Sequence, residues 1–196
     1  MGDFAEHCDR GTQPLYTEDG RLAVVNSRHI LENGLDYDNF ERTDAAYWNQ
    51  PDFVDSQIHR GDKLTYTTGA KIGRTAAYLE NAPALASNHV NLVWVSEENP
   101  IYVSVVLNSM IGRMQTRRAC SGSAQVELYP GDIRNFVVPF VSDKTQEAIA
   151  KAVTDAHHAR ARAKNLLETA KRAVEVAIEQ SEAAGLVLLE DALKEE

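Results

Sequence analysis

The chain has 196 residues, of which 43% are hydrophobic and 25% charged, and its formal net charge is −9. This composition is typical of a folded protein and excludes a fully disordered or fibrous chain; no stretch reaches the roughly 18 apolar residues of a membrane-spanning helix. The two cysteines, Cys8 and Cys120, disfavour a disulfide scaffold or a zinc module, and the N-terminus lacks a secretory signal, so we expect a cytoplasmic protein.

The first three quarters of the chain predict short strands without a regular strand–helix–strand repeat. Leu22–Val25 is typical of a buried strand, Lys63–Thr67 alternates in polarity, and His89–Val95 is the clearest strand in the chain. Phe136–Val138 predicts a last strand, which Pro139 closes. The fold class that we predict is therefore α+β with a mixed sheet, rather than a doubly wound parallel sheet.

One helix is predicted to begin at Pro100, because proline is tolerated in the first turn and Asn99 is a favourable N-cap. The spacing of the apolar residues that follow predicts one buried side. Its members are Ile101, Val105, Met110 or Ile111, and Met114.

A long helix is predicted at the C-terminus, because no Pro or Gly occurs between Asp143 and Ala184 and Ser142 is a plausible N-cap. We predict a domain over residues 1–141 and a helix with a tail over 142–196, with Gly185 ending or kinking the helix. An apolar seam at four- and three-residue steps predicts an antiparallel coiled coil with a partner, although a helix packed on its own domain is the alternative. The seam residues are Ile149, Val153, Ala156, Ala163, Leu167, Ala170, Val174 and Ala177.

The motifs of several enzyme classes do not occur. Residues 69–75 have one residue too few between their glycines for a phosphate-binding P-loop. His157 and His158 are adjacent on the predicted helix, about 100° apart, and so cannot share a metal as an i, i+4 pair would. Neither a G-x-S-x-G elbow nor an HExxH zinc motif is present. The sequence therefore predicts no catalytic residue, no metal site and no cofactor.

A set of weak motifs, in order, resembles one known family. Residues 61–75 read GDKLTYTTGAKIGRT, residues 86–91 ASNHVN, and residues 99–102 NPIY, followed by LNS at 107–109. Residues 121–125 and 128–133 read SGSAQ and LYPGDI. This series resembles the target-recognition domain of specificity (S) subunits of type I restriction–modification enzymes, over about residues 11–180. The resemblance implies a non-catalytic reader of DNA sequence.

The chain departs from the family in size. A usual S subunit has two recognition domains separated by two antiparallel helices, whereas this chain has one domain and one helix. The resemblance therefore implies a half-size subunit, which either dimerises through its helix to read a palindromic split target or needs a different partner. The sequence leaves open whether the chain is a natural half or a fragment.

Candidate DNA-binding residues follow from the resemblance and from two basic islands on an acidic chain. The turn after residue 66 offers hydroxyls, backbone NH groups and cations, and three arginines follow at i, i+4 and i+5. For Arg74 a structural salt bridge is the alternative, for the three arginines a solvated helix face, and for the serines and glutamine local capping. The candidates are Thr67, Thr68, Gly69, Lys71, Arg74, Arg113, Arg117, Arg118, Ser121, Ser123 and Gln125.

Base-reading residues are expected in a variable loop, and residues 37–54 form the longest irregular stretch predicted in the chain. Trp48 and Trp94 are expected in the core rather than in base stacking. The candidate base readers are Asn39, Arg42, Tyr47, Asn49 and Gln50.

The leading hypothesis is a DNA-recognition subunit that positions a DNA methyltransferase on double-stranded DNA and forms a homodimer. A nuclease subunit as a further partner is left open. The alternative is an interaction or regulatory protein that binds the methyltransferase without reading DNA. The net charge of −9 predicts weak DNA binding by the isolated chain, with affinity that falls as salt rises.

Overall fold

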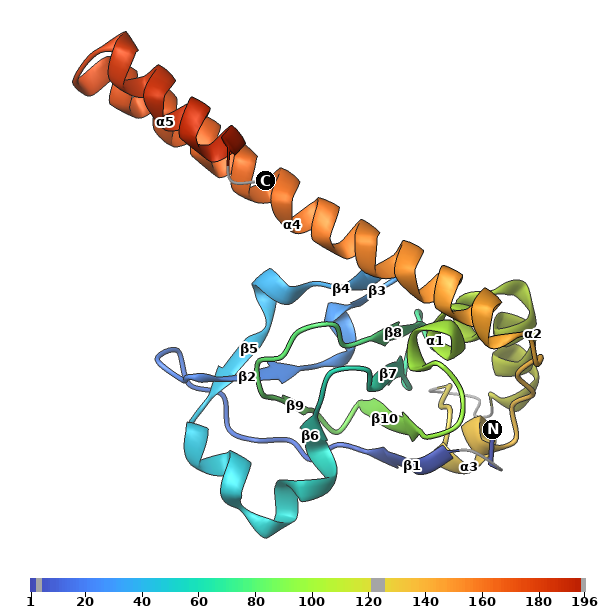
Figure 1. Ribbon diagram of the computed structural model, residues 1–196. Helices are drawn as coiled ribbons and strands as arrows, with labels where there is room; N and C mark the ends of the chain where they lie inside the picture. Colours follow the sequence, from blue (N-terminus) through green and yellow to red (C-terminus); the bar gives the residue numbers. More distant parts are fainter. Residues whose placement is uncertain (3–4, 121–125, 195–196) are drawn as a thin grey trace. The chain divides into compact units, whose positions relative to one another are not determined.

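The chain forms two compact units, Met1–Lys151 (unit 1) and Ala152–Glu196 (unit 2). The computed structural model describes residues 1–2, 5–120 and 126–194 (Figure 1). The division between the units falls within helix α4 (Asp143–Glu179), whose first two turns belong to unit 1.

The first sheet of unit 1 is antiparallel throughout, in the order β1-β10-β7-β8. Strand β10 is central because its VNLVWV run carries apolar residues on both faces. The predicted strands around residues 63–67 and 89–95 are confirmed. The strands are β1 (Ala5–Arg10), β10 (Val90–Val95), β7 (Lys63–Tyr66) and β8 (Thr75–Ala77).

The second sheet is mixed, in the order β5-β2-β9-β6, with β2 and β9 parallel. It confirms the predicted strand at Leu22–Val25 and, with the first sheet and the helices, the α+β class. Its strands are β5 (Glu41–Thr43), β2 (Leu22–Val25), β9 (Ala84–Ala86) and β6 (Gln57–Ile58), and β3 (Ile30–Leu31) pairs with β4 (Gly34–Leu35) in a separate hairpin.

Two apolar clusters lie on the two sides of the first sheet. On one side Val93 of β10 packs with Val103 and Ile133 from the helices. On the other side Leu92 packs with Val25 of the second sheet and with Tyr78. Strand β10 therefore supplies both cores with alternate residues, which explains why its sequence is almost continuously apolar.

Helix α1 (Pro100–Asn108) begins as predicted, and the Asn99 side chain accepts hydrogen bonds from the backbone NH groups of Ile101 (3.0 Å) and Tyr102 (3.2 Å). Ser109 adopts an extended backbone conformation that ends α1. A second helix, α2 (Met110–Ala119), begins at the next residue. A short helix, α3 (Pro130–Arg134), follows and contacts β1.

The predicted apolar side of this region is wrong. Helix α1 buries Tyr102, Val103, Val106 and Leu107, whereas the predicted residues of α2 are exposed. The prediction assumed one continuous helix with a single apolar side. The helix breaks at Ser109, so α2 starts in a new direction and buries Gly112 and Thr116 instead. The exposed members of the predicted side are Val105, Met110, Ile111 and Met114.

The strand predicted at Phe136–Val138 is also wrong. Phe136 and Val138 are buried and Val137 is exposed, as in a strand, but the segment belongs to no sheet. The backbone of Val137 pairs instead with the Gln115 side chain, accepting from its amide nitrogen (3.0 Å) and donating to its amide oxygen (2.6 Å). The alternation of apolar residues at 136–138 thus predicted correctly which side chains are buried. The backbone hydrogen bonds expected from a neighbouring strand are made by the Gln115 side chain.

Lys63 is 1% exposed in the middle of the first sheet, between Val93 and Ala77 on the neighbouring strands. Burial lowers the pKa of its ammonium group from 10.5 to about 8, an effect that the Asp62 carboxylate partly offsets. Because a buried charge costs free energy, Lys63→Met should raise the free energy of unfolding at pH 7 by about 1–3 kcal/mol.

The pH dependence tests the cause of this effect. Below pH 8 the lysine is protonated in both states and the cost is constant; between about pH 8 and pH 10.5 the unfolded state binds more protons, so stability rises with pH. Urea unfolding followed by tryptophan fluorescence should show this rise in the wild type and not in Lys63→Met. The exposed Lys71→Met is the control, and an equal gain in that variant would contradict the burial argument.

Unit 2 is a helical hairpin. Helix α4 ends at Glu179, and α5 (Glu182–Lys194) runs back along it (Figure 1). The prediction that Gly185 ends or kinks the long helix is wrong, because the residue lies inside α5. A Cβ at this position would lie 2.5 Å from the Ala173 carbonyl oxygen and 2.9 Å from the Ala177 Cβ of α4. The glycine therefore permits the two helices to approach closely. Within the described residues no helix is long and apolar enough to cross a membrane.

Candidate nucleic-acid interface

The turn between β7 and β8 carries most of the predicted phosphate-binding residues. It is closed by two backbone hydrogen bonds of 2.8 Å, from Tyr66 to the Arg74 carbonyl and from Gly73 to the Tyr66 carbonyl. Gly69 (φ 113°) and Gly73 (φ 82°) adopt backbone angles that favour glycine. The two glycines thus shape a tight turn whose exposed side chains include Lys71 and, partly, Arg74.

The two threonines of the turn are buried. Thr67 is fully buried, and its hydroxyl donates to the His89 carbonyl (2.9 Å) while its own carbonyl accepts from Leu128 (2.9 Å). Thr68 forms an isolated bridge with Glu127. In this conformation the threonines fix the turn, and the side chains left to meet a phosphate are the cations.

Helix α2 lies against the same turn, because Gly73 packs on Thr116: a Cβ added at Gly73 would be 2.5 Å from the Thr116 methyl group. Arg113 donates to the Asn108 carbonyl (3.0 Å) and forms an ion pair with Glu32. The Arg113 hydrogen bond, with a smaller contribution from Arg74, lowers the pKa of the Glu32 carboxyl.

Glu32 thus stands beside two of the predicted DNA contacts. The remaining arginines of the island, Arg117 and Arg118, are exposed and form no ion pair with any described residue. The structure therefore places α2 against the turn at Gly73 and Thr116, and Glu32 partly neutralises the cations there; we call the cations of the turn and of α2 the basic surface.

A second polar group, not predicted from the sequence, lies at the same end of the sheet. Arg10, the last residue of β1, is 3.5 Å from the Glu127 carboxylate, and its guanidinium lies 5.2 Å from the Tyr129 ring centroid. Opposite Arg10 on β10, Asn91 is fully buried, and its amide has no hydrogen-bond partner among the described residues. An isolated arginine near the N-terminus carries no motif, so only the strand pairing reveals this group.

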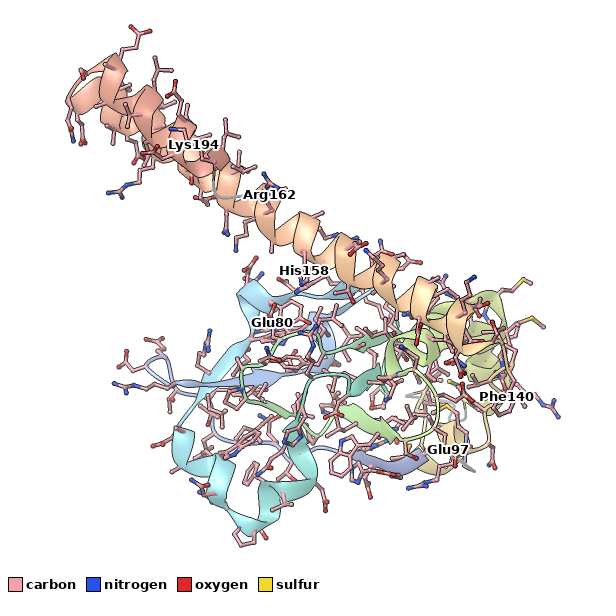
Figure 2. All side chains as sticks on the ribbon, in the orientation of Figure 1. Glu80, Glu97, Phe140, His158, Arg162 and Lys194 are labelled. Carbon is pink, nitrogen blue, oxygen red and sulfur yellow. The ribbon has the colours of Figure 1, made fainter. Side chains whose placement is uncertain are left out.

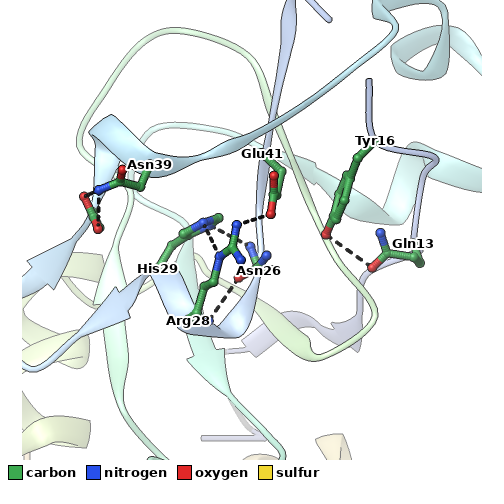
Figure 3. A network of polar contacts seen from close by, with 8 residues as sticks. Gln13, Tyr16, Asn26, Arg28, His29, Asn39 and Glu41 are labelled. Atoms are coloured by element: carbon green, nitrogen blue, oxygen red, sulfur yellow. Dashed lines mark hydrogen bonds and ion pairs between the residues drawn. The ribbon is translucent and has the colours of Figure 1, made fainter. Parts of the chain in front are cut away.

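The predicted base readers lie elsewhere, just before, on and after β5 of the second sheet. The prediction that residues 37–54 are irregular is wrong. Strand β5 and three 3-10 helices, Tyr37–Asn39, Ala45–Asn49 and Pro51–Ser56, cover most of this stretch. The Asn39 amide donates to both Asp36 carboxylate oxygens (3.0 and 2.9 Å), next to the network around Arg28 and Glu41 (Figure 3).

The other candidates for base reading differ in exposure. Tyr47 packs edge-on against Phe53, with ring centroids 4.8 Å apart, and Trp48 is half-buried beside the same cluster. Arg42, Asn49 and Gln50 are exposed. Ser121, Ser123 and Gln125 lie outside the described residues.

The predicted helical seam is divided in three. Ile149 packs against the core of unit 1, and Ala170 and Ala177 are half-buried in the hairpin of unit 2. Leu167 and Val174 are 57% and 60% exposed, and Ile178 continues this line at 80%. Leu167, Val174 and Ile178 stay exposed because α5 covers a different face of α4. Of the others, Val153 is half-buried, and Ala156 and Ala163 are exposed.

Comparison with known proteins adds a fold-level match. A type I restriction–modification S subunit from M. genitalium superposes with a TM-score of 0.57 and 14% identity, covering 91% of this chain and 42% of that one. The chain has the fold of one half of a type I S subunit. A chain from a structure of complex assembly and conformational transition in the type I R-M system matches with a TM-score of 0.54 and 14% identity, over 99% of this chain and 44% of that one.

The S-subunit fold confirms the resemblance predicted from the short motifs, and the long C-terminal helix agrees with it. The chain spans less than half the length of either matched chain. No family model matches the sequence, and no curated protein matches it. At 14% identity the agreement is one of fold, and what the turn and α2 can bind depends on their own chemistry.

Proposed function

We propose that the chain is a cytoplasmic, non-catalytic DNA-recognition subunit of a type I restriction–modification system. The observation that carries the proposal is the S-subunit fold, which covers 91% of this chain and 42% of the matched S subunit. In this role the chain holds a DNA methyltransferase on its target; a nuclease subunit is not required by the proposal.

The basic surface supports a phosphate contact. Lys71 and Arg74 stand on a rigid turn, and Arg117 and Arg118 extend from the adjacent helix without an ion pair to any described residue. A guanidinium can bind a phosphate with two parallel hydrogen bonds, and a fixed turn lowers the entropy lost on binding. Because the chain carries a net charge of −9, we expect tight binding only in the assembled complex.

The exposed line on α4 supports a homodimer. Leu167, Val174 and Ile178 follow each other at seven- and four-residue steps, which is the spacing of a coiled-coil seam. Antiparallel pairing of two such helices gives two recognition domains related by a two-fold axis. The proposed target is therefore palindromic and split, with one half-site for each copy.

Replacing Arg74 and Arg117 together by alanine should lower the DNA affinity of the complex with its methyltransferase by about tenfold or more. Removal of two phosphate contacts should also reduce the slope of log affinity against log salt by up to about 2. Fluorescence anisotropy with a labelled target duplex measures both, and co-purification measures the association with the methyltransferase, which should not change.

The matched control removes two exposed arginines outside the basic surface, Arg21→Ala with Arg172→Ala, and should leave both quantities unchanged. Unchanged DNA affinity in Arg74→Ala, Arg117→Ala would contradict the proposed surface. If the wild-type complex also showed no DNA binding, the interaction or regulatory protein would replace the DNA reader.

A further inference from the structure

Three side chains at one end of the first sheet combine donors with an acceptor. They are Arg10, Glu127 and Tyr129, and we call them the Arg10 group. Arg10 is the last residue of the edge strand β1, at the end of the sheet opposite to Glu97, which follows β10 (Figure 2). The side chains of Arg10 and Glu127 are 28% and 26% exposed, and Tyr129 is 47% exposed. The group can therefore meet a molecule outside the protein.

The members of the Arg10 group hold one another in place. The Tyr129 hydroxyl donates a hydrogen bond to the Glu127 carboxylate, and the Arg10 guanidinium lies over the Tyr129 ring. The hydrogen bond from Tyr129 and the charge of Arg10 lower the pKa of the Glu127 carboxyl, so this carboxyl is ionised at neutral pH. The group thus presents a guanidinium and a carboxylate side by side.

Arg10 keeps hydrogen-bonding capacity that the described residues do not use. Its Nη2 lies 3.5 Å from the Glu127 carboxylate, which is longer than a hydrogen bond, and neither Nη2 nor Nε has a hydrogen-bond partner among the described residues. Asn91 lies directly opposite on β10 and projects from the same side of the sheet; its buried amide also lacks such a partner. Unpaired polar atoms cost free energy, so their concentration at one place indicates a bound molecule that supplies the missing partners.

The Arg10 group is joined to the turn that carries part of the basic surface. Glu127 forms the isolated bridge with Thr68 of the turn. The strand register places Arg10 of β1 in one row with Thr75 of β8, the residue after Arg74. Three strand spacings separate the ends of this row by about 14 Å, which is close to the width of about 12 Å of the major groove of DNA. One duplex can therefore touch the Arg10 group and the turn.

A G·C base pair fits the charges of the Arg10 group better than a phosphate does. The Glu127 carboxylate repels a phosphate, whereas guanine offers two acceptors in the major groove and cytosine offers its amino group as a donor. We propose that the Arg10 group reads one G·C pair of the target, with Arg10 donating to guanine and Glu127 accepting from the cytosine amino group. The inference rests on the proposed function and adds a base contact to the phosphate contacts of the basic surface.

Selection from a library of randomised duplexes by the complex with its methyltransferase tests the base contact. The wild-type complex should select a motif with an invariant G·C pair in each half-site that this chain reads. Arg10→Ala should accept other bases at that pair, with the preference for guanine reduced about tenfold or more, and should keep the other positions, which shows that the variant is folded. Glu127→Ala should relax the same pair, and the double variant should add little to either change.

Replacement of that guanine by 7-deazaguanine gives a second readout, because the analogue lacks the N7 acceptor. The affinity of the wild-type complex should fall about fivefold or more, whereas Arg10→Ala should bind both duplexes equally. The matched control is Arg21→Ala, an exposed arginine outside the group, which should behave as the wild type does. Fluorescence anisotropy with labelled duplexes measures these affinities.

The outcomes separate this inference from the proposed function. An Arg10→Ala complex that selects the wild-type motif overturns the base contact, as does one that weakens binding to all duplexes equally and lowers the salt slope by about 1, which is the signature of a lost phosphate contact. If Arg10→Ala does not fold, Arg10→Met, which keeps the apolar stem, is judged by the same criteria. A wild-type complex that selects no motif overturns the proposed function itself.

Discussion

Gly73→Val is expected to lower the free energy of unfolding of unit 1 by roughly 3–5 kcal/mol. The residue adopts φ 82°, where a β-branched side chain is strained, and its added Cβ would lie 2.5 Å from the Thr116 methyl group and 2.6 Å from the Thr116 hydroxyl. The turn and α2 cannot both keep their places. Since the two predicted basic islands meet at this contact, DNA binding should fall with stability.

Urea unfolding followed by tryptophan fluorescence measures this loss, because Trp48 and Trp94 both lie in unit 1. Adding Thr116→Ala should recover part of the lost stability by removing the clash, while the backbone strain remains. Gly131→Ala is the control, since nothing lies within 4 Å of its added Cβ, and should change stability by less than about 1 kcal/mol. A loss below about 1 kcal/mol in Gly73→Val would contradict the packing of the turn on α2.

A charge at the centre of the exposed α4 line should dissociate the dimer. Val174→Glu with Leu167→Glu places four carboxylates in the two-fold interface, where each would be buried without a partner. The dissociation constant should rise roughly a hundredfold or more, while helix content stays constant because glutamate is a good helix former. Light scattering gives the mass and circular dichroism gives the helix content.

Asn165→Glu provides the matched control for this experiment. It adds a carboxylate to the same helix two residues before Leu167, about 200° around the axis, and position 165 is exposed. The mass should remain that of a dimer. A dimer that survives both glutamates on the α4 line would place the interface on another surface.

The elements that could be predicted are those fixed by local chemistry. Strands β2, β7 and β10 follow from runs of β-branched and apolar residues, and α1 starts where Asn99 and Pro100 provide a cap and a first turn. The start of α4 follows from residues 142 and 143. These signals lie within a few residues of each other and need no knowledge of the rest of the fold.

The predictions that failed depend on contacts distant in sequence. Whether Phe136–Val138 joins a sheet is decided by Gln115, and the role of Gly185 is decided by Ala173 and Ala177. The exposure of Met110 and Met114 follows from a break in the helix at Ser109 that periodicity alone does not show.

The candidate site was predicted in its sequence position but not in its layout. The motif at residues 61–75 located the turn, while the burial of Thr67 and the ion pair of Arg113 required the paired strands. The group around Arg10 joins residues from opposite ends of the domain, Glu127 and Tyr129, and carries no local signal.

The proposed role of this chain as a DNA-recognition subunit is tested most directly by a map of methylated bases in the genome of the source organism, with and without the gene for this chain. We expect a palindromic motif in two parts that is methylated only when the gene is present, and that loses methylation when Arg74 and Arg117 are replaced by alanine. A methylation pattern that does not change when the gene is deleted would contradict the assignment of this chain as a DNA-recognition subunit.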